Sequence, residues 1–419
     1  MAAIKAMNAP APTVSLQFGR KTTHYEVIHV PVPHILVASA KELHGWWNGL
    51  APYGNRECTA EKLLINPYNG CSHHCLFCYS HALGGYFTLF RERGVVTVFK
   101  DFDKQVESQL DGLRVASCGY LSPVSDPFQP INARYELSEK IIKAMVNRNI
   151  PVHVTTKGRI SEPALHLLKR QEHAYGEVSL LTLDEEKRQR LMAGGAVTDE
   201  LLRNIERLAN AGKFAVCRID PIIPFVTDSR EELDAAVREA VKAGAGQIIT
   251  SCLDIPVQLR TKLIGELARR FGVPEQRFAR LYTELMSGRL HATLEYRQKL
   301  FSTMRAICDR NRVPMSLCME FESLGGRRVR GLNEVYMSSY NCAGSNVPLY
   351  VRSGSGRWFE PVEGCRGNCV KCHGLEREPA CGIPELQQAG AWKLKDYRRW
   401  SKELTVRSAT QKTGGPKGQ

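Results

Sequence analysis

Three closely spaced cysteines are the side chains in this sequence best suited to chemistry. They are Cys71, Cys75 and Cys78, separated by three and two residues, in a polar segment that contains Gly70 and follows a short apolar run. Thiolates at such spacing bind soft metals, and three of them hold a [4Fe–4S] cluster while one iron keeps no protein ligand. The spacing therefore predicts an iron–sulfur cluster that accepts an external ligand at its fourth iron.

The amino and carboxylate groups of S-adenosylmethionine (SAM) can fill that open position. An electron from the reduced cluster then cleaves the sulfonium C–S bond, and the resulting radical abstracts hydrogen. The alternative is a zinc site in which His73, His74 or His81 completes the set of ligands. Tyr79, an aromatic residue directly after the third cysteine, and the position of the loop after a strand favour iron–sulfur.

A second group of cysteines lies near the C-terminus. Its members are Cys342, Cys365, Cys369, Cys372 and Cys381, and His373 stands among them as a nitrogen donor. Four thiols suffice for a second, auxiliary [4Fe–4S] cluster, but the last four cysteines also suit a structural zinc ribbon. Residues 349–359, between the first two of these cysteines, alternate apolar residues with a Ser/Gly turn and predict a β-hairpin.

The 14 cysteines together argue against a disulfide framework in a chain of 419 residues with no apolar signal segment. Cys217, Cys252 and Cys318 stand in apolar runs and are expected to be core residues. No run of eighteen apolar residues occurs, so the sequence predicts a cytoplasmic protein without a membrane span.

The net charge of +14 favours an anionic partner such as nucleic acid. Much of the excess lies in the C-terminal region, where Lys and Arg outnumber Asp and Glu, and a solvated tail explains that part equally well. Nucleic acid therefore stays one alternative among the partners.

Short β-branched runs alternate with segments of helical period between residues 62 and 319, which is typical of a parallel sheet with crossover helices. The expected strands are 63–65, 115–121, 151–155, 178–183, 214–219, 247–251 and 314–319, and the expected helices are 102–110, 137–147, 162–171, 199–210, 231–243, 257–270 and 293–311. Six to seven such units predict an α/β fold, a partial (β/α)6–7 barrel with its reactive groups at the carboxyl ends of the strands. Four regions follow: an N-terminal extension (1–61), the barrel (62–324), a small cysteine-rich metal-binding module (325–407) and a disordered tail (408–419).

Further stretches resemble the radical SAM superfamily, and within it the group similar to spore photoproduct lyase. Besides the cysteine loop, they are Ser125–Pro130, Thr155–Lys157, Val178–Leu180 and Ile219–Pro224. The resemblance implies that Ser125, Lys157 and Ser179 line the SAM site, with Lys157 as partner of the methionyl carboxylate. Arg218 and Asp126 are weaker candidates, and either suits an internal ion pair equally well; Tyr79 is a further candidate for cofactor binding.

The resemblance has one departure. Spore photoproduct lyases carry a hydrogen-donating cysteine just before the Ser-Asp-Pro segment, whereas Ser122, Pro123 and Val124 precede Ser125 here. Repair of spore photoproduct is therefore not expected, although the fold and the radical chemistry are. The C-terminal cysteines look like the auxiliary-cluster modules, of twitch or SPASM type, found after some radical SAM barrels, although their spacings differ.

The leading interpretation is a radical SAM enzyme that abstracts hydrogen from a small-molecule or peptide substrate, aided by an electron donor such as flavodoxin or ferredoxin. Nucleic-acid repair or modification is the alternative substrate reading, supported by the basic charge. A non-catalytic zinc protein that binds nucleic acid is the alternative from another class.

Overall fold

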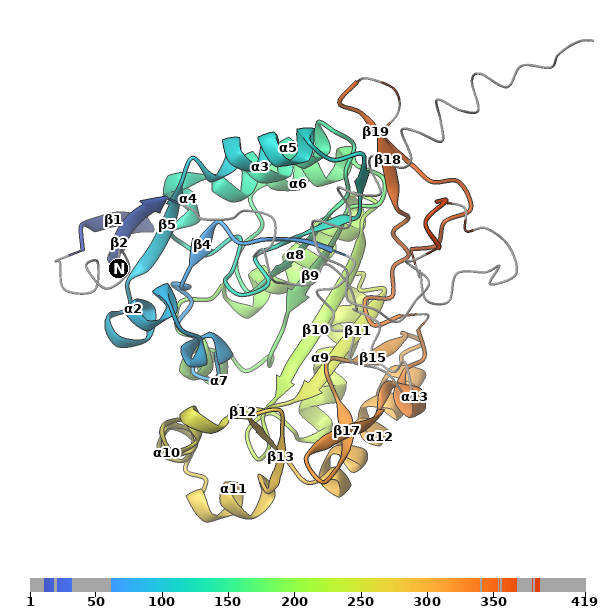
Figure 1. Ribbon diagram of the computed structural model, residues 1–419. Helices are drawn as coiled ribbons and strands as arrows, with labels where there is room; N and C mark the ends of the chain where they lie inside the picture. The colour runs from blue at the N-terminus through green and yellow to red at the C-terminus, as the bar shows by residue number, and fades with distance from the viewer. Residues whose placement is uncertain are drawn as a thin grey trace, which may run out of the picture.

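The computed structural model describes residues 11–18, 21–31, 62–339, 341–352, 354, 356–367, 379 and 381–384. A seven-stranded sheet forms its centre, in the order β15-β11-β10-β9-β8-β7-β3 (Figure 1). All neighbouring strands in it are parallel. Its strands are β3 (Lys62–Ile65), β7 (Cys118–Leu121), β8 (Val152–Thr156), β9 (Tyr175–Ser179), β10 (Phe214–Ile222), β11 (Gln247–Cys252) and β15 (Met315–Leu317).

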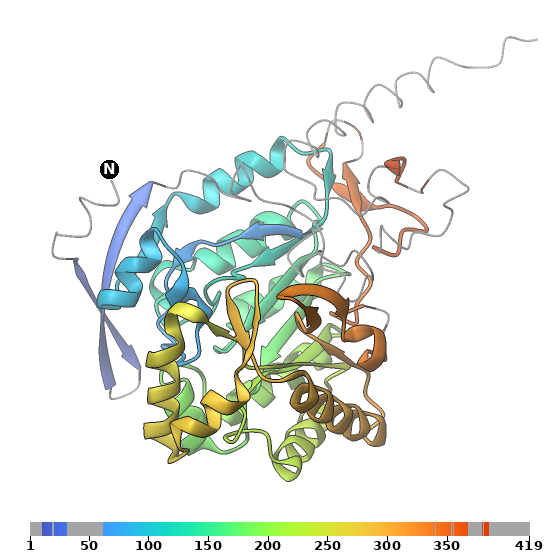
Figure 2. The same cartoon turned by 60° about the horizontal axis from the view of Figure 1, so that its bottom comes forward.

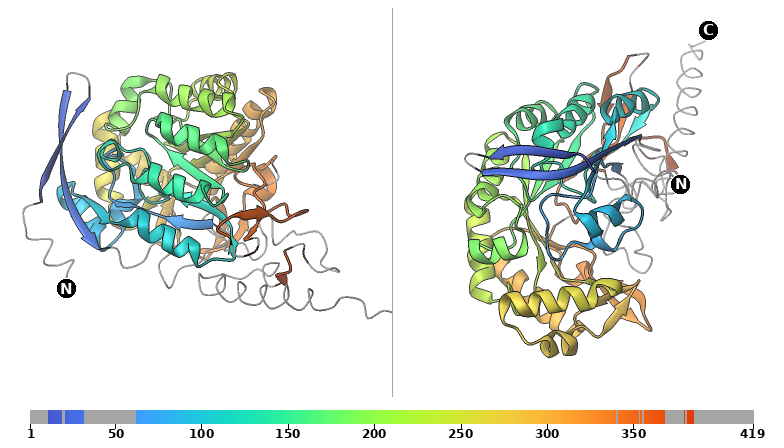
Figure 3. Two further views of the ribbon diagram at one scale, coloured as in Figure 1. Left: turned by 90° about the horizontal axis from the view of Figure 1, so that it is seen from above. Right: turned by 90° about the vertical axis from the view of Figure 1, so that its left-hand side faces the viewer.

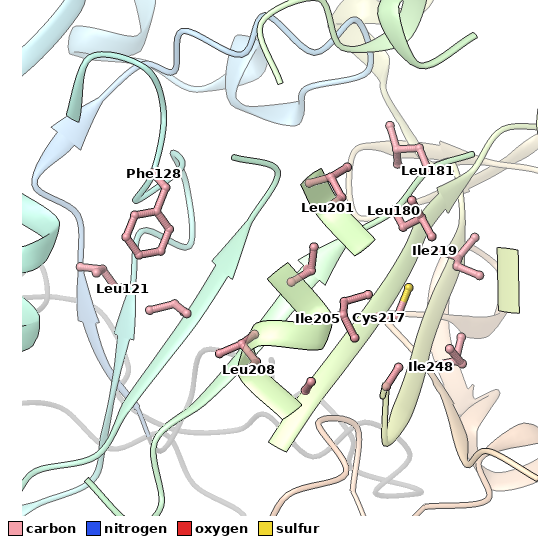
Figure 4. Packing of buried hydrophobic residues seen from close by; sticks show 14 of the residues in the cluster. Leu121, Phe128, Leu180, Leu181, Leu201, Ile205, Leu208, Cys217, Ile219 and Ile248 are labelled. Carbon is pink, nitrogen blue, oxygen red and sulfur yellow. The ribbon is translucent and has the colours of Figure 1, made fainter. Parts of the chain in front are cut away.

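Helices connect these strands, because parallel neighbours require a crossover. They are α3 (Phe102–Asp111), α5 (Leu137–Val146), α6 (Glu162–Arg170), α8 (Thr198–Asn210), α9 (Arg230–Lys242) and α12 (Leu294–Arg310). They cover the outer side of the sheet (Figure 3), and Figure 4 shows Leu201, Ile205 and Leu208 of α8 among the buried side chains there. Within the described part of the chain, no helix combines the length and apolar character that crossing a bilayer requires.

The structure confirms the predicted α/β class and the order of strands and helices along the barrel. One strand prediction was displaced: the chain is extended at Tyr175–Ser179 rather than at 178–183. The reason is that Glu177 lies inside the sheet with a polar partner on each side, so the strand lacks the apolar signature expected of it. The predicted strand 115–121 is also two strands, because β6 (Val115–Ala116) leaves the main sheet to pair with β18 (Tyr350–Arg352).

Smaller sheets surround the barrel. Strands β1 (Thr13–Phe18), β2 (Lys21–Pro31), β5 (Val96–Lys100) and β4 (Tyr68–Asn69) form one; β16 (Phe321–Leu324) and β17 (Arg327–Gly331) form another; β19 (Phe359–Pro361), β18 and β6 form a third. The β18–β19 pair is antiparallel, which confirms the predicted hairpin. The remaining helices are η1 (Tyr79–Ala82), α2 (Tyr86–Arg93), α4 (Asn132–Tyr135), α7 (Glu185–Leu191), η2 (Val257–Leu259), α10 (Arg260–Phe271), α11 (Glu275–Leu281) and α13 (Asn333–Tyr336).

An insertion between β11 and α12 packs against the cysteine loop. Its strands β12 (Ile255–Pro256), β14 (Arg289–His291) and β13 (Glu284–Met286) form a three-stranded sheet, visible beside α10 and α11 in Figure 2. Arg289 binds both oxygens of Asp254 at 2.8 Å, and its guanidinium lies 5.4 Å from the centre of the Tyr79 ring. The insertion therefore contacts the residue that follows the third cysteine.

A buried ion network holds this insertion to the barrel. The fully buried guanidinium of Arg297 donates to Glu284 at 2.8 Å and to Glu320 at 3.0 Å, and Glu320 also accepts from the Cys252 backbone N–H. These contacts join α12, β13 and the end of β11. Removal of one member would leave a buried charge without its full set of partners, which is costly.

Glu320 makes stability depend on pH. Burial, opposed by Arg297, raises the pKa of this carboxyl to about 7 from 4.5. Between these values the folded protein binds more protons than the unfolded chain, so the free energy of unfolding falls as pH rises, by roughly 3 kcal/mol in total from this group. Glu320→Gln removes the titration, and we expect the melting temperature of the variant, relative to wild type, to increase between pH 4.5 and pH 7.5. A difference that does not change with pH would contradict this prediction.

Candidate active site

The cysteine loop lies at the carboxyl end of β3, where parallel strands present their reactive groups. Two neighbouring loops hold its backbone. Leu76 N–H donates to Leu191 at 2.8 Å, Gly194 N–H donates to the His73 carbonyl at 2.9 Å, and the Gln129 side chain accepts from Ser72 N–H at 2.9 Å. The end of α7, the loop that follows it and the loop after β7 therefore fix the conformation of the cysteine loop.

Cys71, Cys75 and Cys78 are half-buried free thiols. Burial raises the pKa of Cys71 well above its usual value and that of Cys75 to about 12, although the nearby Lys157 acts in the opposite direction on Cys75. Thiols in such surroundings become ligating thiolates when a metal supplies the compensating charge. Soft donors from one short loop thus fit an iron–sulfur cluster.

In the described residues, no three or more His, Cys, Asp or Glu side chains converge on one ion position. A cluster of four irons binds each thiolate through a different iron, so its ligands do not need to converge. Of the histidines considered as zinc ligands, His73 is buried and its ring nitrogens face the Gly194 carbonyl, at 2.8 Å, and Asp126, at 3.2 Å.

Asp126 organises the region beneath the cysteine loop. It accepts hydrogen bonds from Phe128 N–H at 2.8 Å, Thr156 Oγ1 at 2.7 Å and Lys157 N–H at 2.6 Å. Burial opposes ionisation of Asp126, but His73 and these donors outweigh it and lower the pKa of the carboxyl. Asp126 therefore ties the cysteine loop to the ends of β7 and β8. Each of its two oxygens already has two contacts, so it is not placed to bind a cofactor.

The residues expected to line the SAM site lie near one another. Lys157 Nζ donates to Ser179 Oγ at 3.1 Å, and its charge acts on Cys75, so one ammonium group faces both the β9 end and the cysteine loop. Within the described part of the chain, Ser122 Oγ and Ser125 Oγ are buried and have no hydrogen-bond partner. Buried hydroxyls without partners are costly, and a polar ligand bound at this point would satisfy these two.

Toward the amino ends of the strands from Lys157 and Ser179, the face of the sheet turned away from the helices carries polar side chains. The His153 ring stacks between Tyr120, at 4.3 Å, and Tyr175, at 4.4 Å, and its Nε2 lies 3.0 Å from Glu177. Arg218 donates to Glu177 at 2.7 Å and also binds Asp220. Arg218 is therefore a member of an internal ion pair, the alternative that the sequence left open for it.

Cys318 differs from its prediction as a core residue. It is half-buried, and its sulfur lies 3.1 Å from the Arg218 guanidinium, because β15 ends beside β11 and turns this thiol toward the polar face. Cys217 and Cys252 are core residues as predicted. Cys118 packs with Tyr175 and Cys342 near the amino ends of the strands, away from the cysteine loop.

The C-terminal cysteines are described only in part. Cys342 is buried, whereas Cys365 and Cys381 are half-buried and pack against the main core. The Cys365 sulfur accepts from Leu349 N–H at 3.4 Å. Cys369 and Cys372 lie outside the described residues, as does the tail from 408.

Comparison with known families assigns the barrel. The radical SAM superfamily model matches residues 65–240, a stretch that begins just before the cysteine loop and includes β7 to β10. The chain contains a radical SAM domain. Members of this superfamily are enzymes that use a [4Fe–4S] cluster and SAM, so the non-catalytic zinc protein considered above is not the right class.

The chain is also similar to two curated proteins. The chain is 25% identical to the radical SAM Nalpha-GlyT isomerase of Pseudomonas phage M6, over 88% of this chain and 78% of the relative. It is 26% identical to an uncharacterised protein of Mycobacterium tuberculosis, over 53% of this chain and 67% of that protein. Among solved structures, Streptococcus suis SuiB bound to S-adenosylmethionine has a TM-score of 0.39 at 13% identity, covering 67% of this chain and 55% of SuiB.

The structure adds positioning residues that the sequence did not single out. Gln129 and Gly194 contact the cysteine loop from positions 57 and 122 residues after Ser72. Gln129 was inside a noted motif, but its side-chain partner was not evident. No local pattern marks Gly194, because its role depends on a contact between distant loops.

Proposed function

We propose that Cys71, Cys75 and Cys78 hold the [4Fe–4S] cluster of this radical SAM enzyme. The observation that carries this assignment is the set of three half-buried thiols in one loop at the carboxyl end of the first barrel strand. The bound cluster and SAM supply a radical that removes a hydrogen atom from the substrate. The chain contributes the ligands, the orientation of SAM and the exclusion of water.

Lys157, Ser179, Ser125 and Ser122 are the SAM contacts that we propose. Lys157 offers an ammonium group to the methionyl carboxylate, and the charge-assisted hydrogen bond is stronger than a neutral one. The two buried hydroxyls without partners, Ser122 Oγ and Ser125 Oγ, support a polar ligand at the end of β7. Tyr79 is a weaker candidate, because its hydroxyl already donates to the Pro123 carbonyl at 2.7 Å.

We infer a rearrangement as the class of reaction. The phage relative is named an isomerase, and it aligns with 88% of this chain. The substrate would occupy the polar face of the sheet, where Arg218, Asp220 and Glu177 offer charges of both signs. A small molecule, a peptide or one unit of a nucleic acid fits this chemistry, and the likeness to spore photoproduct lyases supports the last.

We also propose an auxiliary [4Fe–4S] cluster at the C-terminal cysteines, with Cys365, Cys369, Cys372 and Cys381 as its ligands and Cys342 as a reserve candidate. The support is the number and spacing of these thiols. A flavodoxin or ferredoxin would supply the electron that starts each turnover. Two clusters predict about eight irons per chain after anaerobic purification. A content of about four irons per chain would mean that only the cluster at Cys71, Cys75 and Cys78 is present.

Lys157→Met tests the SAM site. Loss of a charge-assisted hydrogen bond costs about 1.5–3 kcal/mol, so we expect the KM for SAM to rise roughly 10- to 100-fold. The methionine keeps most of the side-chain volume, and we expect the iron content to stay at the wild-type level. The measurement is formation of 5′-deoxyadenosine by dithionite-reduced protein across a range of SAM concentrations. An unchanged KM would remove Lys157 from the SAM site.

A further inference from the structure

Four arginines gather where the β18–β19 hairpin crosses the amino ends of the barrel strands. Arg352 lies on β18 and donates to the Leu110 carbonyl at 2.6 Å, and Arg114 donates to the Gly354 carbonyl in the hairpin turn at 2.8 Å. Arg148 holds β19 through its own carbonyl, which accepts from Phe359 N–H at 2.9 Å. These three and Arg357, in the turn, are called the arginine cluster below.

Negative charge within the arginine cluster is scarce. Asp111 is the carboxylate that the described ion pairs place there, 2.8 Å from Arg148 and 3.5 Å from Arg357. Glu360 stands on the same hairpin in register with Val351, one position away from Arg352, so it lies on the other face of the pair. Counted over the described residues, one carboxylate against four guanidinium groups is a local excess of about three positive charges.

The excess of positive charge affects Arg352. Its Nε is buried and has no hydrogen-bond partner among the described residues. Burial lowers the pKa of Arg352, and the charges of Arg114, Arg148 and Arg357 lower it further against the single opposing effect of Asp111. A bound anion would relieve the repulsion, and the planar forks of arginine match the oxygens of a phosphate.

An aromatic side chain accompanies these charges. Trp358 follows Arg357 directly and is 50% exposed, and the Arg357 side chain is 74% exposed. Large exposed aromatic rings beside arginines are suited to nucleic acid, because bases stack on the ring while guanidinium groups bind the backbone. A polyanion without aromatic bases, such as an acidic peptide of Glu and Asp, would use the charges but would have no base to stack on the indole.

The position of the arginine cluster favours a long ligand. It lies at the amino ends of the strands, whereas the cysteine loop lies at their carboxyl ends, and in Figure 1 the β18–β19 hairpin is at the far end of the sheet from α7 and β12. Strand β10 has nine residues and spans about 30 Å. One turn of duplex spans about 34 Å, so a nucleic acid reaches from one end to the other, which no small phosphorylated substrate does.

We propose that the arginine cluster and Trp358 bind the phosphodiester backbone and a base of a nucleic acid, one unit of which is the substrate at the opposite end of the barrel. This inference rests on the proposed function for the identity of the reacting end. An electron-donor protein is the rival occupant. Such a donor has to approach the cysteine loop, from which the arginine cluster is separated by the length of the sheet.

The test uses the full-length protein and a fluorescein-labelled single-stranded DNA of thirty nucleotides, with binding followed by fluorescence anisotropy between 50 and 200 mM KCl. We compare Arg357→Glu and Trp358→Ala with Lys242→Glu, which makes the same charge change at an exposed position of α9. We expect Arg357→Glu to weaken binding at least 10-fold. It should also make the plot of log affinity against log salt concentration shallower, by about 0.7 for each phosphate that Arg357 neutralises in the wild type. Trp358→Ala should weaken binding about 5-fold or more without altering the salt dependence. Lys242→Glu should stay within about twofold of wild type.

Two outcomes would overturn the proposal. Equal weakening by Arg357→Glu and Lys242→Glu would show that only overall charge attracts DNA. Competition by polyglutamate as effective as that by unlabelled DNA, with Trp358→Ala unaffected, would identify an acidic protein as the occupant.

A failure of the proposed function can be distinguished from a failure of the nucleic-acid-binding proposal. Formation of 5′-deoxyadenosine without DNA should be the same for Arg357→Glu and wild type, because Arg357 lies outside the catalytic machinery. If wild type forms none but binds DNA through the arginine cluster, the proposed function fails and the binding site stands. Equal melting temperatures of wild type and variants confirm that folding is unchanged.

Discussion

We expect Cys75→Ala to abolish cleavage of SAM. The central cysteine of the loop is flanked by Cys71 and Cys78, and loss of one thiolate leaves a cluster with two protein ligands. We expect 5′-deoxyadenosine to fall by at least about 1,000-fold, equivalent to about 4 kcal/mol of barrier. The iron content should fall by about four per chain. Both are measured on anaerobically purified and reconstituted protein with dithionite as the reductant.

Cys308→Ala is the matched control. Cys308 is a buried thiol on α12, within the main core, so its loss removes one cysteine and some packing without touching the cysteine loop. A core truncation of this size costs about 1 kcal/mol of stability, and activity should stay within about twofold of wild type. Equal losses in both variants would mean that Cys75 acts through folding. Zinc in the purified protein, with no cleavage by wild type, would contradict the iron–sulfur assignment.

The sequence could predict the barrel because its outer face follows the rule of buried apolar residues. Helix exits carry glycines in the left-handed conformation, such as Gly212 and Gly244, where the chain turns back to a strand. The prediction was displaced at β9, since Glu177 faces a polar interior and interrupts the apolar pattern. The apolar pattern of a strand is thus least informative where one face of the sheet packs against helices and the other carries polar side chains.

The proximity of two candidate residues could be predicted, because both stand at the carboxyl ends of neighbouring strands. Lys157 directly follows β8 and Ser179 ends β9, and their side chains meet at 3.1 Å. The contacts that hold the cysteine loop could not be predicted, because each joins residues far apart in the chain. Gln129 and Gly194 make such contacts. The ion network of Arg297 and Glu320, which holds the insertion to the barrel, could not be predicted for the same reason.

We expect Gly194→Ala to push apart the cysteine loop and the loop after α7. An ideal Cβ at this position would lie 2.2 Å from the Ser72 carbonyl oxygen and 3.0 Å from the His73 Cα. Both are backbone atoms of the cysteine loop and cannot rotate away, so the loop after α7 must move. Its backbone φ is not in the left-handed region, so the added methyl group acts only through this contact. We expect iron per chain to fall by more than half and 5′-deoxyadenosine to fall at least about 10-fold, equivalent to about 1.4 kcal/mol.

Variants at two further glycines serve as comparisons for Gly194→Ala. Gly84→Ala adds the same methyl group at an exposed position between η1 and α2, where nothing lies within 4 Å, and we expect no change in iron or activity. At Gly195 the added Cβ would meet the flexible Met192 side chain at 2.6 Å, so this variant should lie between the other two. The order Gly84, Gly195, Gly194 then follows the rigidity of the atoms encountered. If Gly194→Ala retained iron and activity like Gly84→Ala, with an equal melting temperature, the contact between the two loops would not be what holds the cluster site.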